Sequence, residues 1–258
     1  MNQSNTQIVI LAAGLGTRMS RPYPKTLVSI LDKPIIKYLL ASIAESEITS
    51  KPLVVVGYLR EEMMRVLGDQ VEYAIQEKPL GTGDAVKQAL KKIDPHVKNI
   101  IVLYGDHAFV KSETLKRLLK RHEETSAKIS LMTLTLPDFS EWRSVFSHFG
   151  RIIRNQDKKI ERIVEMKEAT EEEKKILEVN PAYFCFDMEW LKENINKINN
   201  YNHKKEYYLT DLVGIAMKHG QVVESVSVRE PIEGIGVNTP QELEIAGKIL
   251  QQKNEIRD

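Results

Sequence analysis

Two cationic residues follow a glycine-containing loop near the start of the sequence. The stretch IVILAAGLGTRM (Ile8–Met19) runs from apolar residues into Gly14 and Gly16, and Arg18 and Lys25 come next. Glycines between a strand and a helix let backbone N–H groups approach an anion closely. Two cations suit a triphosphate whose negative charge grows at one phosphorus during displacement. The loop therefore indicates a phosphate site, although an ordinary strand-to-helix turn with surface cations fits the same letters.

Neither of two common phosphate motifs is present in this loop. A dinucleotide fingerprint would need glycine at position 19, where Met19 stands, and this disfavours a dehydrogenase. A Walker A loop needs glycine directly before its lysine, whereas Pro24 precedes Lys25. The loop is therefore of another type.

A further polar position ends the apolar run NIIVLYGD (Asn99–Asp106). Open α/β sheets bind ligands at the carboxyl ends of their strands, and Asp106 there can hold Mg²⁺, which prefers oxygen ligands. A plain turn residue is the alternative. No His pair in the sequence has metal-ligand spacing, and His107 is expected to pack beside Asp106 rather than bind the metal. No Ser/His/Asp or Cys/His set suggests a covalent intermediate.

Composition excludes several classes of partner. The 258 residues carry a formal net charge of +1, so no overall field recruits nucleic acid or an acidic membrane. No basic segment precedes the apolar run at Ile8, and that run is too short to span a bilayer. Cys185 is the only cysteine, which excludes an internal disulfide, is typical of a buried strand position and fits a cytoplasmic protein.

Apolar runs alternate with helical patterns along the first half of the chain. Continuous apolar runs separated by helices indicate parallel strands that are covered on both faces. The expected strands are Ile8–Ala12, Pro52–Tyr58, Val71–Ile75, Asn99–Asp106 and Ile129–Leu136, and the expected helices are Ile35–Ala44, Glu61–Leu67, Asp84–Lys92 and Glu113–Glu123.

Beyond Pro137 the pattern becomes richer in short β-segments. We expect a hairpin over Gly150–Glu165, strands over Asn180–Phe186 and Val222–Val228, a helix after the N-cap Thr170, and a last helix after the N-cap Thr239. The charge run KEATEEEKK is expected to be a solvated helix face. These elements predict one α/β domain with a Rossmann-like, mostly parallel sheet, helices on both faces and an inserted β-rich lobe.

Seven blocks follow one another along the chain: LAAGLGTRM with its following PK, QEKPLGTGDAV, LYGD, FGRIIR, IVEMKEAT, EYYLTD and GVNTPQEL. Together they resemble the sugar-phosphate nucleotidyltransferases, most closely the uridyltransferase half of the bifunctional N-acetylglucosamine-1-phosphate enzymes. The resemblance implies a nucleotide-diphospho-sugar transferase fold. It also implies a nucleotide-binding core (1–136), a sugar-phosphate-binding lobe (137–230), and a metal-ligand loop with the C-terminal helix (231–258). The chain ends at Asp258 without a hexapeptide-repeat segment, so the resemblance does not extend to the acetyltransferase half.

The resemblance also implies roles for individual residues. Arg18 and Lys25 would clamp the phosphates and stabilise the transition state, while Asp106 and Asn238 would hold Mg²⁺. The nucleotide would lie against Leu11, Ala12, Ala13, Gly14, Gln76, Gly81 and Thr82. The sugar phosphate would lie against Tyr104, Gly105, Gly150, Glu165 and Asn180. Ordinary turn or surface positions remain the alternative for Gln76, Glu165 and Asn238. Because an amide offers both a donor and an acceptor, Gln76 alone does not separate uracil from cytosine.

Two segments depart from the family pattern. Pro181-Ala182 stands where the family shows Thr-Gly; proline removes a backbone donor and alanine disfavours the left-handed conformation. His107-Ala108-Phe109 stands where Val-Pro-Leu is expected. The acceptor sugar is therefore less defined than the chemistry.

The reaction expected from the resemblance joins UTP and a hexosamine 1-phosphate, with Mg²⁺ as cofactor and release of pyrophosphate. Another nucleotide (CTP, GTP or dTTP) or another sugar or alcohol phosphate is the nearest alternative. A non-catalytic nucleotide-sugar-binding regulator is the alternative of another class.

Overall fold

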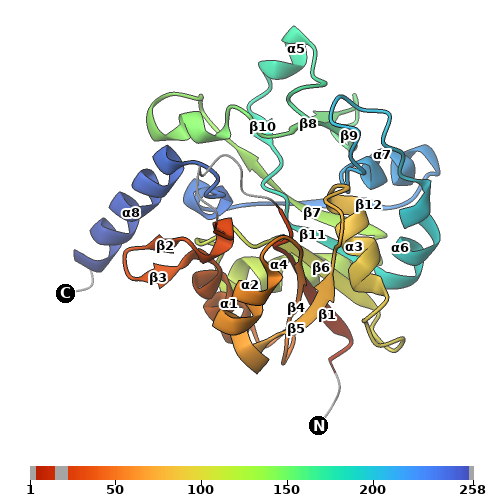
Figure 1. Ribbon diagram of the computed structural model, residues 1–258. Coiled ribbons are helices and arrows are strands. Elements are labelled where there is room, and N and C mark those ends of the chain that lie inside the picture. The colour runs from red at the N-terminus through yellow and green to blue at the C-terminus, as the bar shows by residue number, and fades with distance from the viewer. Residues whose placement is uncertain (1–3, 15–22, 256–258) are drawn as a thin grey trace.

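A computed structural model describes residues 4–14 and 23–255 of the chain (Figure 1). Ten of the described strands form one mixed sheet and two form a small hairpin. The strands are β1 (Thr6–Leu11), β2 (Ser29–Ile30), β3 (Lys33–Pro34), β4 (Leu53–Val56), β5 (Glu72–Ile75), β6 (Asn99–Tyr104), β7 (Ile129–Thr135), β8 (Arg151–Arg154), β9 (Ile160–Val164), β10 (Glu178–Val179), β11 (Phe184–Asp187) and β12 (Val223–Ser227). The helices are α1 (Ile35–Ser46), α2 (Arg60–Leu67), α3 (Thr82–Leu90), α4 (Ser112–Thr125), α5 (Glu171–Lys174), α6 (Met188–Asn194), α7 (Asp211–Lys218) and α8 (Pro240–Glu255).

The strands β5, β4, β1 and β6 lie side by side in this order and are all parallel. Strand β11 then pairs antiparallel with β6 on one side and with β7 on the other, and β12 pairs parallel with β7. The predicted mostly parallel sheet is therefore confirmed. Both β11 and β12 come from the 137–230 segment and pair with strands of the 1–136 segment.

Helices cover both faces of the sheet, as the sequence predicts. Alternate residues of β1 belong to different cores: Ile8 and Ile10 pack with α1, α2 and α4, whereas Val9 and Leu11 pack with α3, α6 and α7. This alternation follows from the two-residue period of a strand. Burial on both sides explains why the strand reads as one continuous apolar run.

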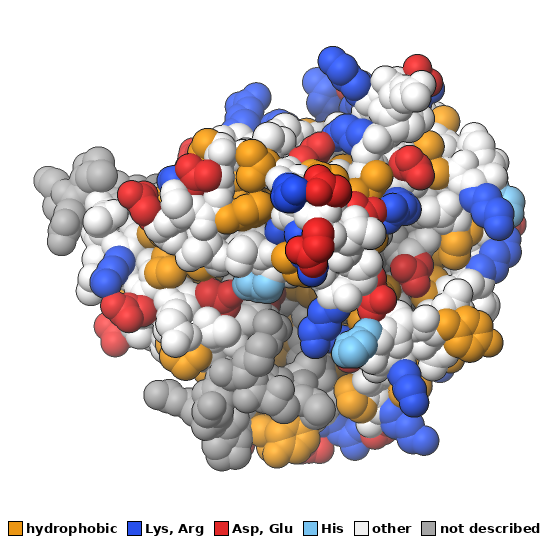
Figure 2. Space-filling model, turned by 90° about the horizontal axis from the view of Figure 1, so that it is seen from above, with side chains coloured by type: hydrophobic (Ala, Val, Ile, Leu, Met, Phe, Trp, Pro, Cys, Tyr) orange, Lys and Arg blue, Asp and Glu red, His pale blue; other side chains and the backbone are white. Residues whose placement is uncertain are grey.

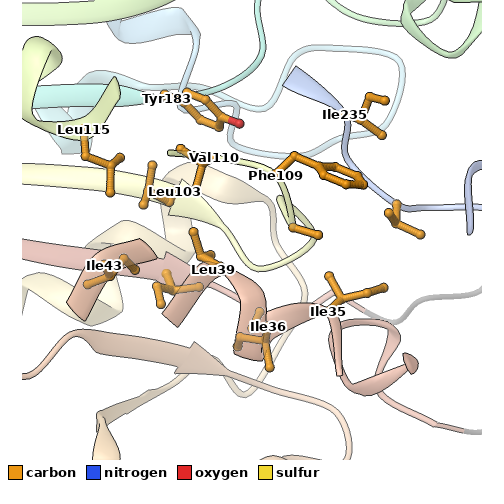
Figure 3. Packing of buried hydrophobic residues seen from close by; sticks show 14 of the residues in the cluster. Ile35, Ile36, Leu39, Ile43, Leu103, Phe109, Val110, Leu115, Tyr183 and Ile235 are labelled. Carbon is orange, nitrogen blue, oxygen red and sulfur yellow. The ribbon is translucent and has the colours of Figure 1, made fainter. Parts of the chain in front are cut away.

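The core on the first face extends under the polar loops described below. Figure 3 shows Leu39 and Ile43 of α1 facing Leu103 of β6, with Phe109 and Ile235 from neighbouring loops beside them. Each of these residues is buried. The loops that follow β6 and precede α8 therefore rest on a packed base.

The strand predicted over Asn180–Phe186 is wrong in its first half. Strands β10 and β11 both pair with β7, but Asn180–Tyr183 lies between them, opposite only two residues of β7. Pro181 has no N–H for a ladder, and Ala182 adopts a left-handed conformation at φ 65°. The Asn180 Oδ1 atom accepts a hydrogen bond from the Ala182 N–H (2.9 Å), which holds this conformation. Asn180–Tyr183 thus forms a β-bulge that is stabilised by the Asn180 side chain.

The bulge joins the parallel part of the sheet to the β8–β9 hairpin. On the edge away from β7, β11 pairs with β6 of the parallel sheet and β10 pairs with β8 of the β8–β9 hairpin. The predicted hairpin is confirmed, and with α5 it projects from one end of the sheet (Figure 1). The segment from β10 to β11, interrupted by the bulge, therefore connects the hairpin to the parallel part of the sheet.

The tip of this projection is charged. The α5 segment begins with the predicted capping box, in which Glu173 N–H donates to the Thr170 side chain and Thr170 N–H donates to the Glu173 carboxylate. Figure 2 shows acidic and basic side chains interleaved on this end of the molecule. None of the described helices is long and apolar enough to cross a membrane.

Candidate active site

Lys25 lies between the two side chains expected to hold a metal. Its Nζ atom donates to Asp106 Oδ2 at 2.6 Å and to Asn238 Oδ1 at 2.7 Å. Asp106 follows β6, Asn238 precedes α8, and Lys25 begins a short 3₁₀ turn. Three residues separated by up to 213 positions therefore meet at one point beyond the carboxyl end of β6.

The start of α8 fixes the orientation of Asn238. The carboxylate of Glu242 accepts from the N–H groups of Asn238 (2.6 Å) and Thr239 (2.8 Å), and the Thr239 hydroxyl accepts from Glu242 N–H (3.2 Å). The predicted cap is confirmed. Asn238 Nδ2 also donates to the Gly236 carbonyl at 3.1 Å, so the amide oxygen is the atom that faces Lys25.

Asp106 is buried and carries an oxygen that lacks a hydrogen-bond partner among the described residues. Burial by itself raises the pKa of the Asp106 carboxyl, but the Lys25 ammonium, 2.6 Å away, outweighs it and holds this pKa below its usual value. The second oxygen, Oδ1, is 3.8 Å from His107 Nε2. The carboxylate is therefore ionised at neutral pH and keeps one oxygen for a further cation.

His107 packs, as the sequence predicts, on the core side of Asp106. Its ring meets the edge of Tyr183 with centroids 4.7 Å apart. Burial lowers the pKa of His107 to about 4, so the ring is neutral at physiological pH. A neutral packed imidazole leaves Lys25 as the cation nearest Asp106 among the described groups.

The oxygen atoms beside Lys25 fit Mg²⁺ better than a softer metal. Asp106 supplies a carboxylate and Asn238 an amide oxygen, the hard ligands that Mg²⁺ prefers. In the part of the chain that the structure describes, no three His, Cys, Asp or Glu side chains converge to hold a metal by themselves. A Mg²⁺ ion here would thus complete its shell with water and ligand phosphates.

Gln76 directly follows β5, and the nitrogen of its side-chain amide is held by two hydrogen bonds. Its Nε2 atom donates to the Gly81 carbonyl at 3.0 Å and to Asp84 Oδ2 at 2.7 Å. Gly81 itself has φ 111°, and a Cβ atom there would lie 2.6 Å from the Tyr207 carbonyl oxygen. Only glycine fits this position without displacing the Glu206–Tyr207 backbone.

Two cavities adjoin at the Lys25 cluster. The first, of about 470 Å³, is lined among others by Leu11, Ala12, Ala13, Gly14, Gln76, Gly81, Thr82 and Lys25. The second, of about 770 Å³, is lined among others by Gly150, Glu165, Asn180, His148, Lys167 and Thr210. Tyr104, Asp106, Asn238, Lys204 and Glu206 line both. Two ligands could therefore meet beside Asp106 and Asn238.

A family comparison decides which chemistry this arrangement serves. A model of the nucleotidyl transferase family matches residues 7–230. The chain belongs to this family. The nucleotidyl transferase is 37% identical over 255 residues to the bifunctional protein GlmU of Caldicellulosiruptor saccharolyticus, and 36% identical over 249 residues to that of Geobacillus thermodenitrificans. These alignments cover 97% and 95% of the chain but 53% and 52% of the relatives, so the chain spans about half their length.

The fold is likewise that of a known structure. A crystal structure described as a putative glucose-1-phosphate thymidylyltransferase from Bacillus anthracis, in complex with a sucrose, superposes with a TM-score of 0.73. The superposition covers 95% of this nucleotidyl transferase and 94% of that chain at 17% identity. The predicted fold class and family are thus confirmed.

The structure brings together most residues singled out in the sequence. All seven expected nucleotide contacts line the first cavity, and four of the five expected sugar-phosphate contacts line the second. Gly105 lines neither; it lies behind the site, where a Cβ atom would be 2.9 Å from Thr26 Cγ2. Arg18 lies outside the described residues.

Several cavity-lining residues of the nucleotidyl transferase were not singled out in the sequence. Lys204 and Glu206 line both cavities, and Lys167, His148 and Thr210 line the second. Thr210 donates to Glu165 Oε1 at 3.1 Å. The block EYYLTD could have indicated Glu206 and Thr210, and its Tyr207 N–H donates to the Leu80 carbonyl beside Gly81 (2.8 Å).

Proposed function

We propose that this nucleotidyl transferase transfers UMP from UTP to N-acetylglucosamine 1-phosphate or a related sugar 1-phosphate, releasing pyrophosphate. The observation that carries the proposal is the Lys25–Asp106–Asn238 cluster at the junction of two cavities. In this proposal segment 1–136 supplies the nucleotide side and segment 137–230 the acceptor side. Segment 231–258 then supplies Asn238.

The reaction needs positioning and charge stabilisation rather than a protein nucleophile. An oxygen of the acceptor phosphate attacks the α-phosphorus of UTP, and the bond from that phosphorus to the bridging oxygen breaks, so that pyrophosphate leaves with its electron pair. Lys25 reaches the junction and donates to the developing charge on the phosphates. Arg18 is proposed to act with it.

Mg²⁺ fits the oxygens of Asp106 and Asn238, as described above. When bound, it would reduce the repulsion between the two polyanions and polarise the α-phosphate. Glu242 keeps Asn238 oriented for this role through the two backbone N–H groups that it accepts.

The acceptor side is where the substrate is least constrained. Glu165 is half-buried, and the loss of solvent around its carboxyl raises the pKa above the ordinary value, while the Thr210 hydroxyl opposes that shift. Pro181 offers no N–H to the sugar. One missing donor to a buried ligand costs about 1–3 kcal/mol, a tenfold to hundredfold change in preference. N-acetylglucosamine 1-phosphate is expected to be accepted without being the sole acceptor.

A substrate panel tests the proposal. Pyrophosphate release is measured for UTP, CTP, GTP and dTTP against glucose, glucosamine, galactosamine and N-acetylated hexosamine 1-phosphates, with Mg²⁺. UTP with N-acetylglucosamine 1-phosphate is expected to give turnover. Turnover only with another nucleotide or another sugar 1-phosphate would show that the proposed substrates are wrong. Binding of a nucleotide sugar without any turnover would favour a regulatory protein.

A further inference from the structure

The Gln76 amide is clamped between two acceptors. Its Nε2 atom donates to the Gly81 carbonyl and to the Asp84 carboxylate, at 3.0 and 2.7 Å. If the amide were reversed, its oxygen would face a carbonyl oxygen and a carboxylate oxygen, which repel it. The network therefore allows one orientation.

Asp84 is itself held in place. It is the third residue of α3, where the partial positive charge of the helix N-terminus stabilises an ionised carboxylate. Its other oxygen, Oδ1, accepts from Gln88 Nε2 one turn later, at 3.0 Å. The clamp on Gln76 is thus backed by a second side chain of the same helix.

The clamp leaves the Gln76 oxygen for the ligand. Gln76 lines the first cavity, and none of the described residues donates to its Oε1 atom. An acceptor at this point pairs with the N3–H of uracil. In cytosine the N3 atom is an acceptor, so the two lone pairs would face one another.

We infer that Asp84 is a positioning residue for base selection: by fixing the Gln76 amide, it makes the cavity prefer bases with a ring N–H at this edge over cytosine and adenine. The inference rests on the proposed function for its ligand, a nucleoside triphosphate bound with its base against Gln76. Guanine and thymine also carry a ring N–H, so Asp84 separates UTP, dTTP and GTP from CTP and ATP.

Two variants and a matched control test the inference. Asp84→Ala removes the carboxylate that holds the Gln76 amide. Asp84→Asn keeps the size of the side chain, but an asparagine amide has both a donor and an acceptor and can therefore pair with the Gln76 amide in either orientation. Glu77→Gln is the control, because it neutralises the carboxylate next to Gln76 in sequence, which is exposed and pairs with Arg60 (2.7 Å). We measure kcat/KM for UTP and CTP, and the dissociation constants of both by calorimetry.

The wild type is expected to prefer UTP. Asp84→Ala should reduce the UTP:CTP ratio about tenfold or more, Asp84→Asn by less, and Glu77→Gln should leave it unchanged. A ratio that stays constant while both nucleotides weaken equally in the Asp84 variants would show a merely structural role and overturn the inference, as would a wild type that prefers CTP. If no sugar phosphate supports turnover, the proposed function fails, and the ratio of the two dissociation constants still decides the role of Asp84.

Discussion

The nucleotide side and the acceptor side of the site are built by different means. Ala12–Gly14 and Gln76 directly follow parallel strands, and Gly81 precedes α3 at a position where no larger residue fits. The acceptor side is assembled from a hairpin, a bulge and the irregular segment before α7. On the nucleotide side, backbone shape thus leaves the choice of base to the one clamped amide of Gln76, whereas several side chains on irregular segments define the acceptor side. Substitutions at more positions should therefore change acceptor choice than nucleotide choice.

The junction between the two sides should show the largest effect. Asp106→Ala removes the only carboxylate proposed to hold Mg²⁺ and should nearly abolish pyrophosphate release. Asn238→Ala should cost less, because water can replace a neutral oxygen. Asp157→Ala in the exposed hairpin turn is the control. Full activity in saturating EDTA would contradict the proposed metal site.

The next effect concerns Lys25. Lys25→Met should lower kcat by about 10²–10³ and change KM less, because it removes a preorganised donor to developing charge. It should also tighten Mn²⁺ binding to the nucleotide-free protein, measured by electron paramagnetic resonance, because the ammonium lies 2.6 and 2.7 Å from the two proposed ligand oxygens. Lys92→Met, at an exposed position, should do neither. Unchanged Mn²⁺ affinity would mean that Lys25 does not compete with the metal.

A smaller effect is expected at the bulge. Ala182→Gly should raise the free energy of unfolding by about 0.5 kcal/mol, since relief of a left-handed alanine exceeds the added chain entropy. Urea denaturation measures this, and Ala127→Gly should instead destabilise, because Ala127 is buried and does not have a positive φ, so the change only adds chain entropy and removes a buried methyl group. A destabilised Ala182→Gly would show that the Asn180 hydrogen bond already removes the strain.

The smallest effect depends on pH. Burial, aided by Glu165 and Glu168, raises the pKa of Asp211 to about 6. A carboxyl whose pKa is raised on folding contributes most to the free energy of unfolding below its unfolded pKa of about 4, where it is protonated in both states. That contribution is lost as the pH rises through about 6, where the folded protein must ionise it. Asp211→Asn should therefore raise the melting temperature at pH 7.5 and leave it unchanged near pH 4. An equal increase at both pH values would exclude titration of Asp211 as the cause.

Local signals in the sequence gave the most accurate predictions. The caps at Thr170 and Thr239 depend on residues three positions away, and both form. Helices α6 and α7 were not predicted; neither has a Glu or Gln three residues after its N-cap, where Trp190 and Val213 stand. The prediction of a strand through Pro181 is wrong, because the apolar pattern there does not show that Pro181 lacks an N–H and that Ala182 takes a left-handed conformation.

Long-range contacts could not be predicted in the same way. The family resemblance assigned Lys25 to phosphates and Asp106 to a metal, but the hydrogen bond that joins these two side chains spans 81 positions. Similarly, the clamp on Gln76 depends on how β5 meets the start of α3. Such contacts depend on packing between elements rather than on any local pattern.

The position of β11 has a consequence for how the chain folds as it is made. Strands β6 and β7 are both complete by Thr135, but β11, which lies between them, arrives with residues 184–187. Until then the facing edges of β6 and β7 have unpaired backbone groups, the kind of edge that recruits other chains. A fragment ending at Leu136 is therefore expected to aggregate, and emergence of Phe184–Asp187 from the ribosome to be the step that joins β6 to β7.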